Sequence, residues 1–104
     1  MKTKIYIAGR MTGLANYNYH NFKRVERILQ SLGYAVINPA RNFSGDTDLP
    51  RDFYIRQCIH DLLNADAIYL FGRWIESDGA RLEHSIAKEL GLQIFHSYRK
   101  PEGK

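Results

Sequence analysis

The stretch DAIYLFGRWIESDGARLEHSIAKELG (Asp66–Gly91) decides the fold of this 104-residue chain. Its first seven residues, Asp66–Gly72, form an almost continuous apolar run, which is typical of a strand in a sheet covered on both faces. A polar loop follows, and from Ser77 the apolar positions recur at helical spacing until Gly91 ends the pattern. The stretch therefore predicts a strand, a loop and a helix.

The same alternation extends over the rest of the chain. Short β-rich runs at Lys4–Gly9, Tyr34–Pro39 and Leu92–Tyr98 predict three further strands. Apolar residues at helical spacing predict two further helices, over 19–32 and 51–64. The apolar stripes of these two helices include Ile28, Leu32 and Leu63, and the stripe of the helix over 77–91 includes Leu90. Alternating strands and helices with short connections predict a parallel sheet with helices on both faces.

The composition limits the class of protein. With 44% hydrophobic and 25% charged residues, it is that of an ordinary globular domain. No apolar run approaches the roughly 18–20 residues of a membrane span, and no cleavable apolar segment opens the chain. The single cysteine, Cys58, forms no internal disulfide, and the four histidines lack metal-ligand spacing. We therefore expect a cytoplasmic protein with no membrane contact and no metal.

The net charge of +4 permits an anionic partner, but the basic residues are scattered. Only Lys23, Arg24 and Arg27 cluster, and Glu26 lies among them. Such a group is typical of a solvated helix face, so nucleic acid is not the favoured partner.

In a parallel α/β sheet, ligands bind beyond the carboxyl ends of the strands. The stretch GRMTG, which follows the first strand, has two glycines that let a backbone approach a ligand closely, although a purely structural turn fits equally well. GRMTG matches neither the dinucleotide-binding fingerprint nor the P-loop motif, which argues against a dinucleotide oxidoreductase and against a P-loop nucleotidase. The candidate binding residues at this edge are Gly9, Arg10, Met11, Gly13, Asn38, Arg41, Trp74, Ser77 and Gly79.

Arginines recur at the same edge. Arg10, Arg41 and Arg73 each follow one of the first three strands, and Arg81 begins the next helix. Any one of them is explained as a surface arginine, but three at one edge favour a phosphorylated or otherwise anionic ligand. Trp74, in the loop after the third strand, either stacks on a base or covers the edge of the core.

Glu83 is the residue that the pattern marks most clearly. It lies on the same helix face as Ala80, Ile86 and Ala87, which should face the core. A carboxylate there is costly unless it has a partner or opens into a cleft. It is therefore either a functional group aimed at a ligand or one half of an ion pair with Arg81, Arg10 or another arginine.

Three other residues carry less information. Asp66 directly precedes a strand, and Asp61 lies on the flank of its helix, about 120° from the apolar stripe. Cys58 lies nearer the buried face, where a lone cysteine usually acts as a small hydrophobic residue.

Three segments together resemble a known family: IYIAGRMTG (5–13), NYNYHNFKRVERILQSLGYAVINPA (16–40) and NADAIYLFGRWIESDGARLEHSIAKELG (64–91). They resemble an uncharacterised family common in phages and bacteria, which looks like a branch of the nucleoside 2-deoxyribosyltransferase-like superfamily. The resemblance covers about Lys4 to Phe95. It implies a single domain over residues 1–104, an α/β fold with a small flavodoxin-like or Rossmann-like parallel sheet of about four strands and helices on both faces, and the cytoplasm of a bacterium or of an infected bacterial host.

The resemblance also implies chemistry at the N-glycosidic bond. In that superfamily a glutamate near the start of a helix, in a motif like D-x-G-x-x-x-E, attacks C1′ of a deoxyribose and forms a covalent intermediate. Glu83 matches that glutamate, with Asp78 and Gly79 in the preceding loop, and Tyr6 matches a first-strand tyrosine that holds it. The resemblance implies no cofactor. It also implies a homodimer or higher homo-oligomer, for which the candidate interface aromatics are Tyr17, Tyr19, Phe43, Phe53 and Tyr54.

One departure from the superfamily bears on catalysis. Its general acid is usually an aspartate eight residues before the acid that opens the third strand, and counting back eight from Asp66 reaches Cys58. Loss of a general acid typically costs roughly 10²–10⁴ in rate. Either Asp61 or Asp78 replaces it, or the protein binds without efficient turnover.

Three functions follow as hypotheses. The first is an N-glycosidase or 2-deoxyribosyltransferase that acts on a deoxynucleotide or nucleoside through Glu83. The second is a non-catalytic module that senses or sequesters a nucleotide. The third, less favoured, is a basic nucleic-acid-binding domain, whose binding would weaken steeply with salt.

Overall fold

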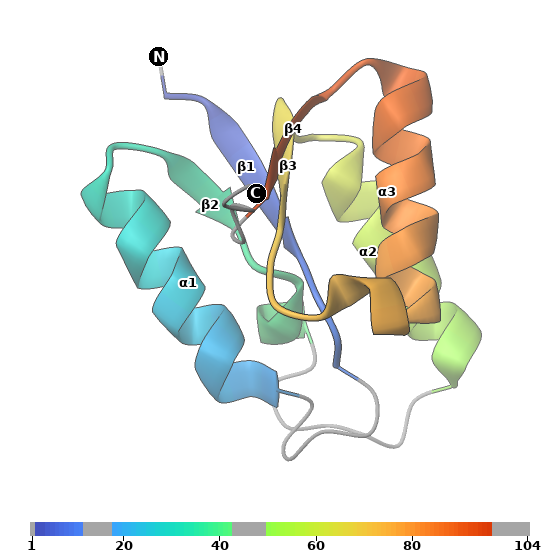
Figure 1. The fold of residues 1–104 in the computed structure, drawn as a ribbon. Coiled ribbons are helices and arrows are strands. Elements are labelled where there is room, and N and C mark those ends of the chain that lie inside the picture. The colour runs from blue at the N-terminus through green and yellow to red at the C-terminus, as the bar shows by residue number, and fades with distance from the viewer. Residues whose placement is uncertain (1, 12–17, 43–49, 97–104) are drawn as a thin grey trace, which may run out of the picture.

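A computed structural model describes residues 2–11, 18–42 and 50–96, without the side chains of residues 41, 42 and 51. Figure 1 shows a sheet with α1 on one face and α2 and α3 on the other. The elements in chain order are β1 (Lys4–Ala8), α1 (Tyr19–Ser31), β2 (Ala35–Ile37), the 3₁₀ helix η2 (Pro39–Asn42), α2 (Arg51–Leu62), β3 (Ala67–Leu70), the 3₁₀ helix η3 (Trp74–Glu76), α3 (Asp78–Leu90) and β4 (Gln93–His96).

The sheet has four parallel strands in the order β2-β1-β3-β4, which confirms the predicted fold class. The chain runs from β1 to β2 on one side and then crosses to β3 on the other side of β1. The strand order therefore switches between β1 and β3, and such a switch is where α/β sheets bind ligands beyond the strand ends. We call that side of the sheet the carboxyl edge.

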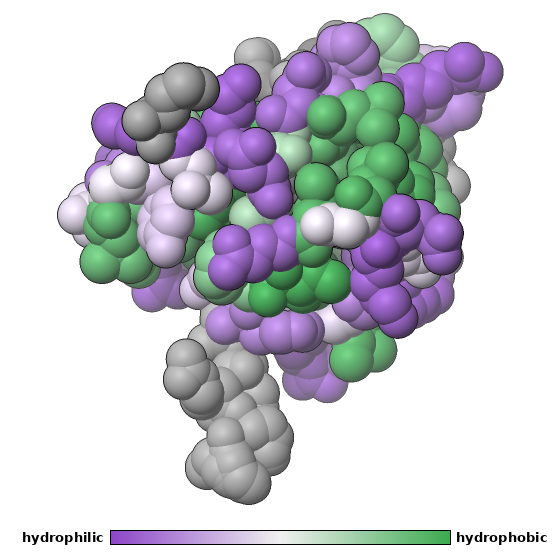
Figure 2. Space-filling view, turned by 90° about the horizontal axis from the view of Figure 1, so that it is seen from above, coloured by the Kyte–Doolittle hydropathy of each residue, from purple (hydrophilic) through white to green (hydrophobic). Residues whose placement is uncertain are grey.

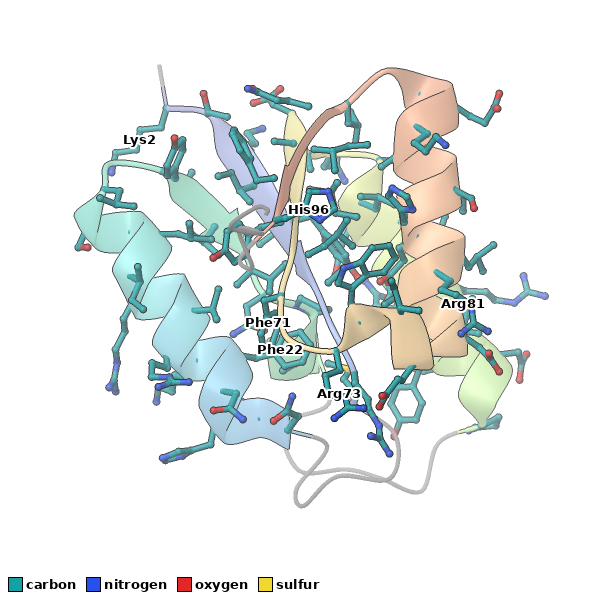
Figure 3. The ribbon with its side chains drawn as sticks, viewed as in Figure 1. Lys2, Phe22, Phe71, Arg73, Arg81 and His96 are labelled. Atoms are coloured by element: carbon teal, nitrogen blue, oxygen red, sulfur yellow. The ribbon has the colours of Figure 1, made fainter. Side chains whose placement is uncertain are left out.

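Alternation along β1 sends its side chains into two separate cores. Ile5 and Ile7 pack in the core that includes Phe22 of α1, whereas Tyr6 and Ala8 pack in the core with α2 and α3. Phe22 meets Phe71 edge to face with ring centroids 4.8 Å apart, and Figure 3 shows both rings between α1 and the sheet. Because side chains alternate along a strand, the sequence order of β1 places Tyr6 on the α2/α3 side.

Several positions predicted to be buried on helices are exposed. Ile28 is 52% exposed and Leu90 is 48% exposed, and Leu32 and Leu63 are also on the surface. The strands have only three to five residues, so the sheet is shorter than the helices packed on it. The sheet therefore does not cover the ends and flanks of the apolar helix faces.

The predicted element ends also change in places. The second strand ends at Ile37, because Pro39 begins a 3₁₀ helix where a loop was expected. The loop after β3 likewise contains η3. The last strand is described as far as His96, and the predicted continuation to Tyr98 lies outside the described residues. In the described part of the chain, no helix has the length and apolar character needed to cross a membrane.

Candidate functional site

The site is built around a direct contact between Tyr6 and Glu83. The Tyr6 hydroxyl donates a hydrogen bond of 2.6 Å to Glu83 Oε2, and both side chains are buried. Tyr6 comes from the central strand β1, and Glu83 lies in the second turn of α3. Ala80 and Ala87 flank Glu83 on the same buried face, and their small side chains let this part of α3 lie close to the sheet.

The start of α3 fixes the position of Glu83 along the helix. Ser77 caps the helix, because its Oγ accepts a hydrogen bond of 3.1 Å from the Ala80 backbone N–H. At the other end Gly91 has a φ of 74°, the left-handed conformation that favours glycine. Both helix boundaries agree with the sequence prediction, and they place Glu83 opposite Tyr6.

The interpretation of Glu83 as half of an ion pair with Arg81 or Arg10 is wrong. Arg81 pairs with Asp78, and Figure 3 shows Arg81 on the outer side of α3. Arg10 pairs with Glu76 at 3.1 Å. Within the described residues, Tyr6 is the hydrogen-bond donor to the Glu83 carboxylate.

Burial controls the titration of this site. Burial raises the pKa of Glu83 to about 7, although the Tyr6 hydrogen bond acts in the opposite direction. Burial and the nearby Glu83 charge raise the pKa of Tyr6 well above its ordinary value, so Tyr6 remains a donor. Glu83 therefore titrates much closer to neutral pH than an exposed glutamate, as is expected of an acid or base group that works near pH 7.

Cys58 belongs to the same cluster. It is buried on α2, as the sequence predicts, and adjoins Tyr6 and Glu83. Burial, followed by the Glu83 charge, raises the pKa of its thiol to about 12. A thiol with that pKa stays protonated at neutral pH and donates its proton poorly.

The two aspartates predicted as substitute general acids differ in position. Asp61 is half-buried one helical turn after Cys58, and its charge also raises the pKa of the Cys58 thiol. Asp78 is exposed and bound to Arg81 at the surface. Asp61 is therefore the carboxylate nearer to the buried cluster.

Some predicted binding residues are occupied within the protein. A Cβ atom on Gly9 would lie 2.6 Å from the Phe71 ring, so this glycine allows close packing and the structural reading of the turn is favoured. The Asn38 amide donates to Glu26 at 3.0 Å and accepts from the Ala40 backbone at 2.9 Å. Both ends of the amide are therefore engaged within the protein, and a role of Asn38 in ligand binding stays a prediction.

The remaining predicted residues fall into two groups. Met11 is half-buried between the two cores, and Gly79 is half-buried beside the Ser77 cap. Gly13 lies outside the described residues, and Arg41 belongs to η2 with a side chain that is not described.

Trp74 is half-buried against the α2/α3 core, which favours its role as a cover of the core edge. Its ring meets His84 edge to face with centroids 4.8 Å apart and lies 6.1 Å from the His96 ring. Burial, with Lys88 and His96 nearby, lowers the pKa of His84. The contact of Trp74 with His84 and His96 was not predicted from the sequence. Trp74 lies in the loop after β3, where no regular spacing relates it to the two histidines.

The contacts of two acidic residues, Glu26 and Glu76, were also not predicted from the sequence. Glu26 is buried on α1, on the face of Phe22 and Leu29, so the helical spacing that marks Glu83 marks it too. Glu76 pairs with Arg10 and Arg73, and no sequence pattern indicates this contact between loops. In the described ranges, no three His, Cys, Asp or Glu side chains are grouped so that they could hold a metal ion.

The fold resembles that of the nucleoside 2-deoxyribosyltransferase-like superfamily. A solved structure of the 2-deoxyribosyltransferase from the psychrotolerant bacterium Bacillus psychrosaccharolyticus is similar, with a TM-score of 0.72 and 20% sequence identity. The similarity covers 90% of this chain and 71% of that chain. Residues 3–96 match the model of a family described as a domain of unknown function (DUF4406), and the chain belongs to this family. A search of the curated proteins found no match. A phage source stays a prediction.

Proposed function

We propose that this protein cleaves or exchanges the N-glycosidic bond of a deoxynucleotide or nucleoside, with Glu83 as the nucleophile. The observation that carries the proposal is the 2.6 Å hydrogen bond from Tyr6 to a buried Glu83 near the strand-order switch. Burial makes the carboxylate costly to keep, and the phenol fixes it in one orientation.

The chemistry starts from the ionised form of Glu83. Its Oε1 atom forms a bond to C1′ while the C1′–N bond breaks, and the bonding electron pair leaves with the base. The transition state carries positive charge on the sugar ring, which the carboxylate stabilises at close range. Water or an acceptor base then attacks C1′, the bond to Glu83 breaks, and the configuration at C1′ is retained.

The departing base needs a proton in the first step. Cys58 is at the position expected for the donor, but its thiol has a pKa of about 12. Asp61 is better placed than Asp78, because Asp78 is held by Arg81 at the surface. We assign the proton delivery to Asp61 and expect slow turnover, since Asp61 lies on the flank of its helix.

A non-catalytic nucleotide-binding module is the second candidate, and Cys58 is the observation that favours it. A site without an efficient proton donor can still hold a nucleotide beside Glu83. The two functions share the residues around Glu83 and differ in whether a free base appears.

A base-release assay separates the two candidates. The protein is incubated with deoxynucleoside 5′-monophosphates and with deoxynucleosides, and free base is resolved by chromatography. Glu83→Gln is compared with Glu89→Gln, a matched change on the exposed side of the same helix. We expect base release by the wild type and by Glu89→Gln, and none by Glu83→Gln. Release that survives Glu83→Gln contradicts the proposal, and binding without release supports the second candidate.

We also propose that the protein forms a homo-oligomer. Figure 2 shows hydrophobic residues gathered over one side of the face seen from above. Exposed apolar side chains on α2, η3 and α3 are Phe53, Leu63, Ile75, Leu82 and Leu90. Of the predicted interface aromatics, Tyr19 and Tyr54 are half-buried, while Tyr17 and Phe43 lie outside the described residues. Light scattering coupled to gel filtration gives the mass, and a monomer contradicts this part of the proposal.

A further inference from the structure

The carboxyl edge holds a second charged cluster, which the reaction above does not use. Arg10 follows β1, Arg73 follows β3, and both bind Glu76 in η3. The Arg10 Nη1 atom lies 3.1 Å from Glu76 Oε1, and the Arg73 Nε atom donates to Glu76 Oε2 at 2.7 Å. Figure 3 shows Arg73 in the loop after β3, beside η3. One carboxylate is thus held between two guanidinium groups from two different loops.

The backbone at Arg10 is also fixed. Asn18 Nδ2 donates to the Arg10 carbonyl at 2.9 Å, and Asn18 Oδ1 accepts from Asn21 at 2.7 Å. Asn18 has a φ of 64° and is the one non-glycine residue with positive φ in the described part of the chain. Asparagine tolerates this conformation better than most residues. The turn therefore holds the Arg10 main chain in place while its side chain binds Glu76.

The cluster lies close along the chain to both members of the Tyr6–Glu83 pair. Arg10 follows Tyr6 by four residues, at most about 13 Å along an extended chain. Glu76 precedes the Ser77 cap of α3, and Glu83 follows that cap by six residues, about 9 Å along the helix. A sugar whose C1′ faces Glu83 can therefore direct its 5′ substituent toward the strand ends where Arg10 and Arg73 meet.

The net charge of the cluster suits an anion that carries more negative charge than a carboxylate. Two guanidinium groups and one carboxylate leave a net charge of +1. Arg10 and Glu76 have side chains that are 37% and 38% exposed, so their ion pair is weak and exchangeable. A phosphate monoester presents three oxygens and up to two negative charges, and it suits the planar donor fork of each arginine.

We propose that Arg10 and Arg73 bind the 5′-phosphate of a deoxynucleotide, and that Glu76 occupies this phosphate site until the substrate displaces it. The substrate class is then the deoxynucleoside 5′-monophosphates and not the free nucleosides. The identity of the sugar and base portion rests on the proposed function, whereas the phosphate site rests on the arginine cluster alone. Glu76 acts as a competing internal anion, so the protein excludes ligands too weakly charged to displace it.

The test measures binding in the Glu83→Gln background, in which no turnover is expected. Isothermal titration gives the Kd of a deoxynucleoside 5′-monophosphate and of its matched deoxynucleoside. We expect Arg10→Ala and Arg73→Ala each to weaken nucleotide binding about ten- to a hundredfold, because a charge-assisted hydrogen bond is lost. Binding of the deoxynucleoside should change little. Glu76→Gln should tighten nucleotide binding severalfold, because the internal competitor is neutralised.

Two controls keep the result specific. Arg56→Ala removes an exposed arginine of α2 that pairs with Asp52, and it should leave both affinities unchanged. Arg10→Lys keeps the charge without the planar fork, and it should recover part of the nucleotide affinity. Circular dichroism confirms that each variant is folded.

The outcomes separate this inference from the proposed function. Equal loss of nucleotide and deoxynucleoside binding in Arg10→Ala and Arg73→Ala overturns the phosphate site, as does weaker nucleotide binding in Glu76→Gln. Arginine-dependent nucleotide binding without any base release supports the phosphate site and contradicts the glycosidase. Glu83-dependent base release with arginine-independent binding supports the glycosidase and contradicts the phosphate site.

Discussion

Two glutamates are buried in the described part of the chain, on opposite faces of the sheet, and they have different partners. Glu26 on α1 accepts a hydrogen bond from Asn38 on Oε1 at 3.0 Å and one from Gln30 on Oε2 at 3.3 Å. Glu83 on α3 accepts from Tyr6 on Oε2 at 2.6 Å. Burial alone therefore does not mark a functional carboxylate. A carboxylate with both oxygens bound by amides is suited to holding structure, whereas Glu83, which among the described residues is bound by one phenol, is suited to presenting its other oxygen to a ligand.

Replacing each glutamate by glutamine should give opposite results, and this is the largest expected effect. Glu83→Gln keeps the shape and an acceptor for Tyr6 but loses the nucleophile, so base release should fall by about 10³-fold or more. Glu26→Gln places a new donor against Asn38 or Gln30, so it should lower the free energy of unfolding by about 1–3 kcal/mol with kcat retained. Chromatographic assay and urea denaturation measure the two quantities. Loss of kcat in a folded Glu26→Gln variant would contradict the structural role assigned to Glu26.

The pH dependence of stability should report the buried Glu83. Its pKa is about 7 in the folded protein and near 4.5 when exposed, so the folded state binds its proton more tightly. Its contribution to stability is therefore full below about pH 4.5 and is lost as the pH rises through 7, up to about 3 kcal/mol in all. The measurement is the difference in the free energy of unfolding between wild type and Glu83→Gln, from pH 4.5 to 8. A difference that stays flat across this range contradicts the raised pKa.

Removing the Tyr6 hydroxyl tests whether its hydrogen bond controls the pKa of Glu83. Tyr6→Phe deletes the hydrogen bond that lowers the Glu83 pKa, so that pKa should rise above about 7. The acidic limb of the pH–rate profile should then move to higher pH, and kcat at neutral pH should fall by about 10²-fold. An unshifted limb would mean that Tyr6 contributes packing only.

The smallest expected effect concerns Asn38. Asn38→Ala removes one donor to Glu26 and the acceptor for the Ala40 N–H, and both groups are buried. We expect a loss of about 1–3 kcal/mol in the free energy of unfolding and little change in KM. A large rise in KM with unchanged stability would instead support Asn38 as a ligand-binding residue.

Local patterns predicted the elements that place Glu83. The alternation in β1, the Ser77 cap and Gly91 are properties of adjacent residues, and so is the helical spacing that sets Glu83 on the inner face of α3. Tyr6 as the partner came from the family resemblance, because it is far from Glu83 in the sequence.

Contacts between distant loops could not be predicted from such patterns. Nothing near Glu76 indicates that Arg10 would bind it, since the contact depends on how the loops after β1 and β3 meet. The exposure of Ile28 and Leu90 likewise depends on the extent of the sheet, which the helical spacing does not report. Glu26 is different: its spacing relative to Phe22 and Leu29 was available in the sequence and indicates burial.

The most direct test of the account is to trap the intermediate. The wild-type protein is incubated at high concentration with a deoxynucleoside 5′-monophosphate for times matched to its slow turnover, quenched in acid, digested and analysed by mass spectrometry. We expect the peptide that contains Glu83 to gain the mass of one deoxyribosyl phosphate, and Glu83→Gln to show no such gain. Release of free base with no adduct on that peptide, at an equal rate in Glu83→Gln, would contradict Glu83 as the nucleophile.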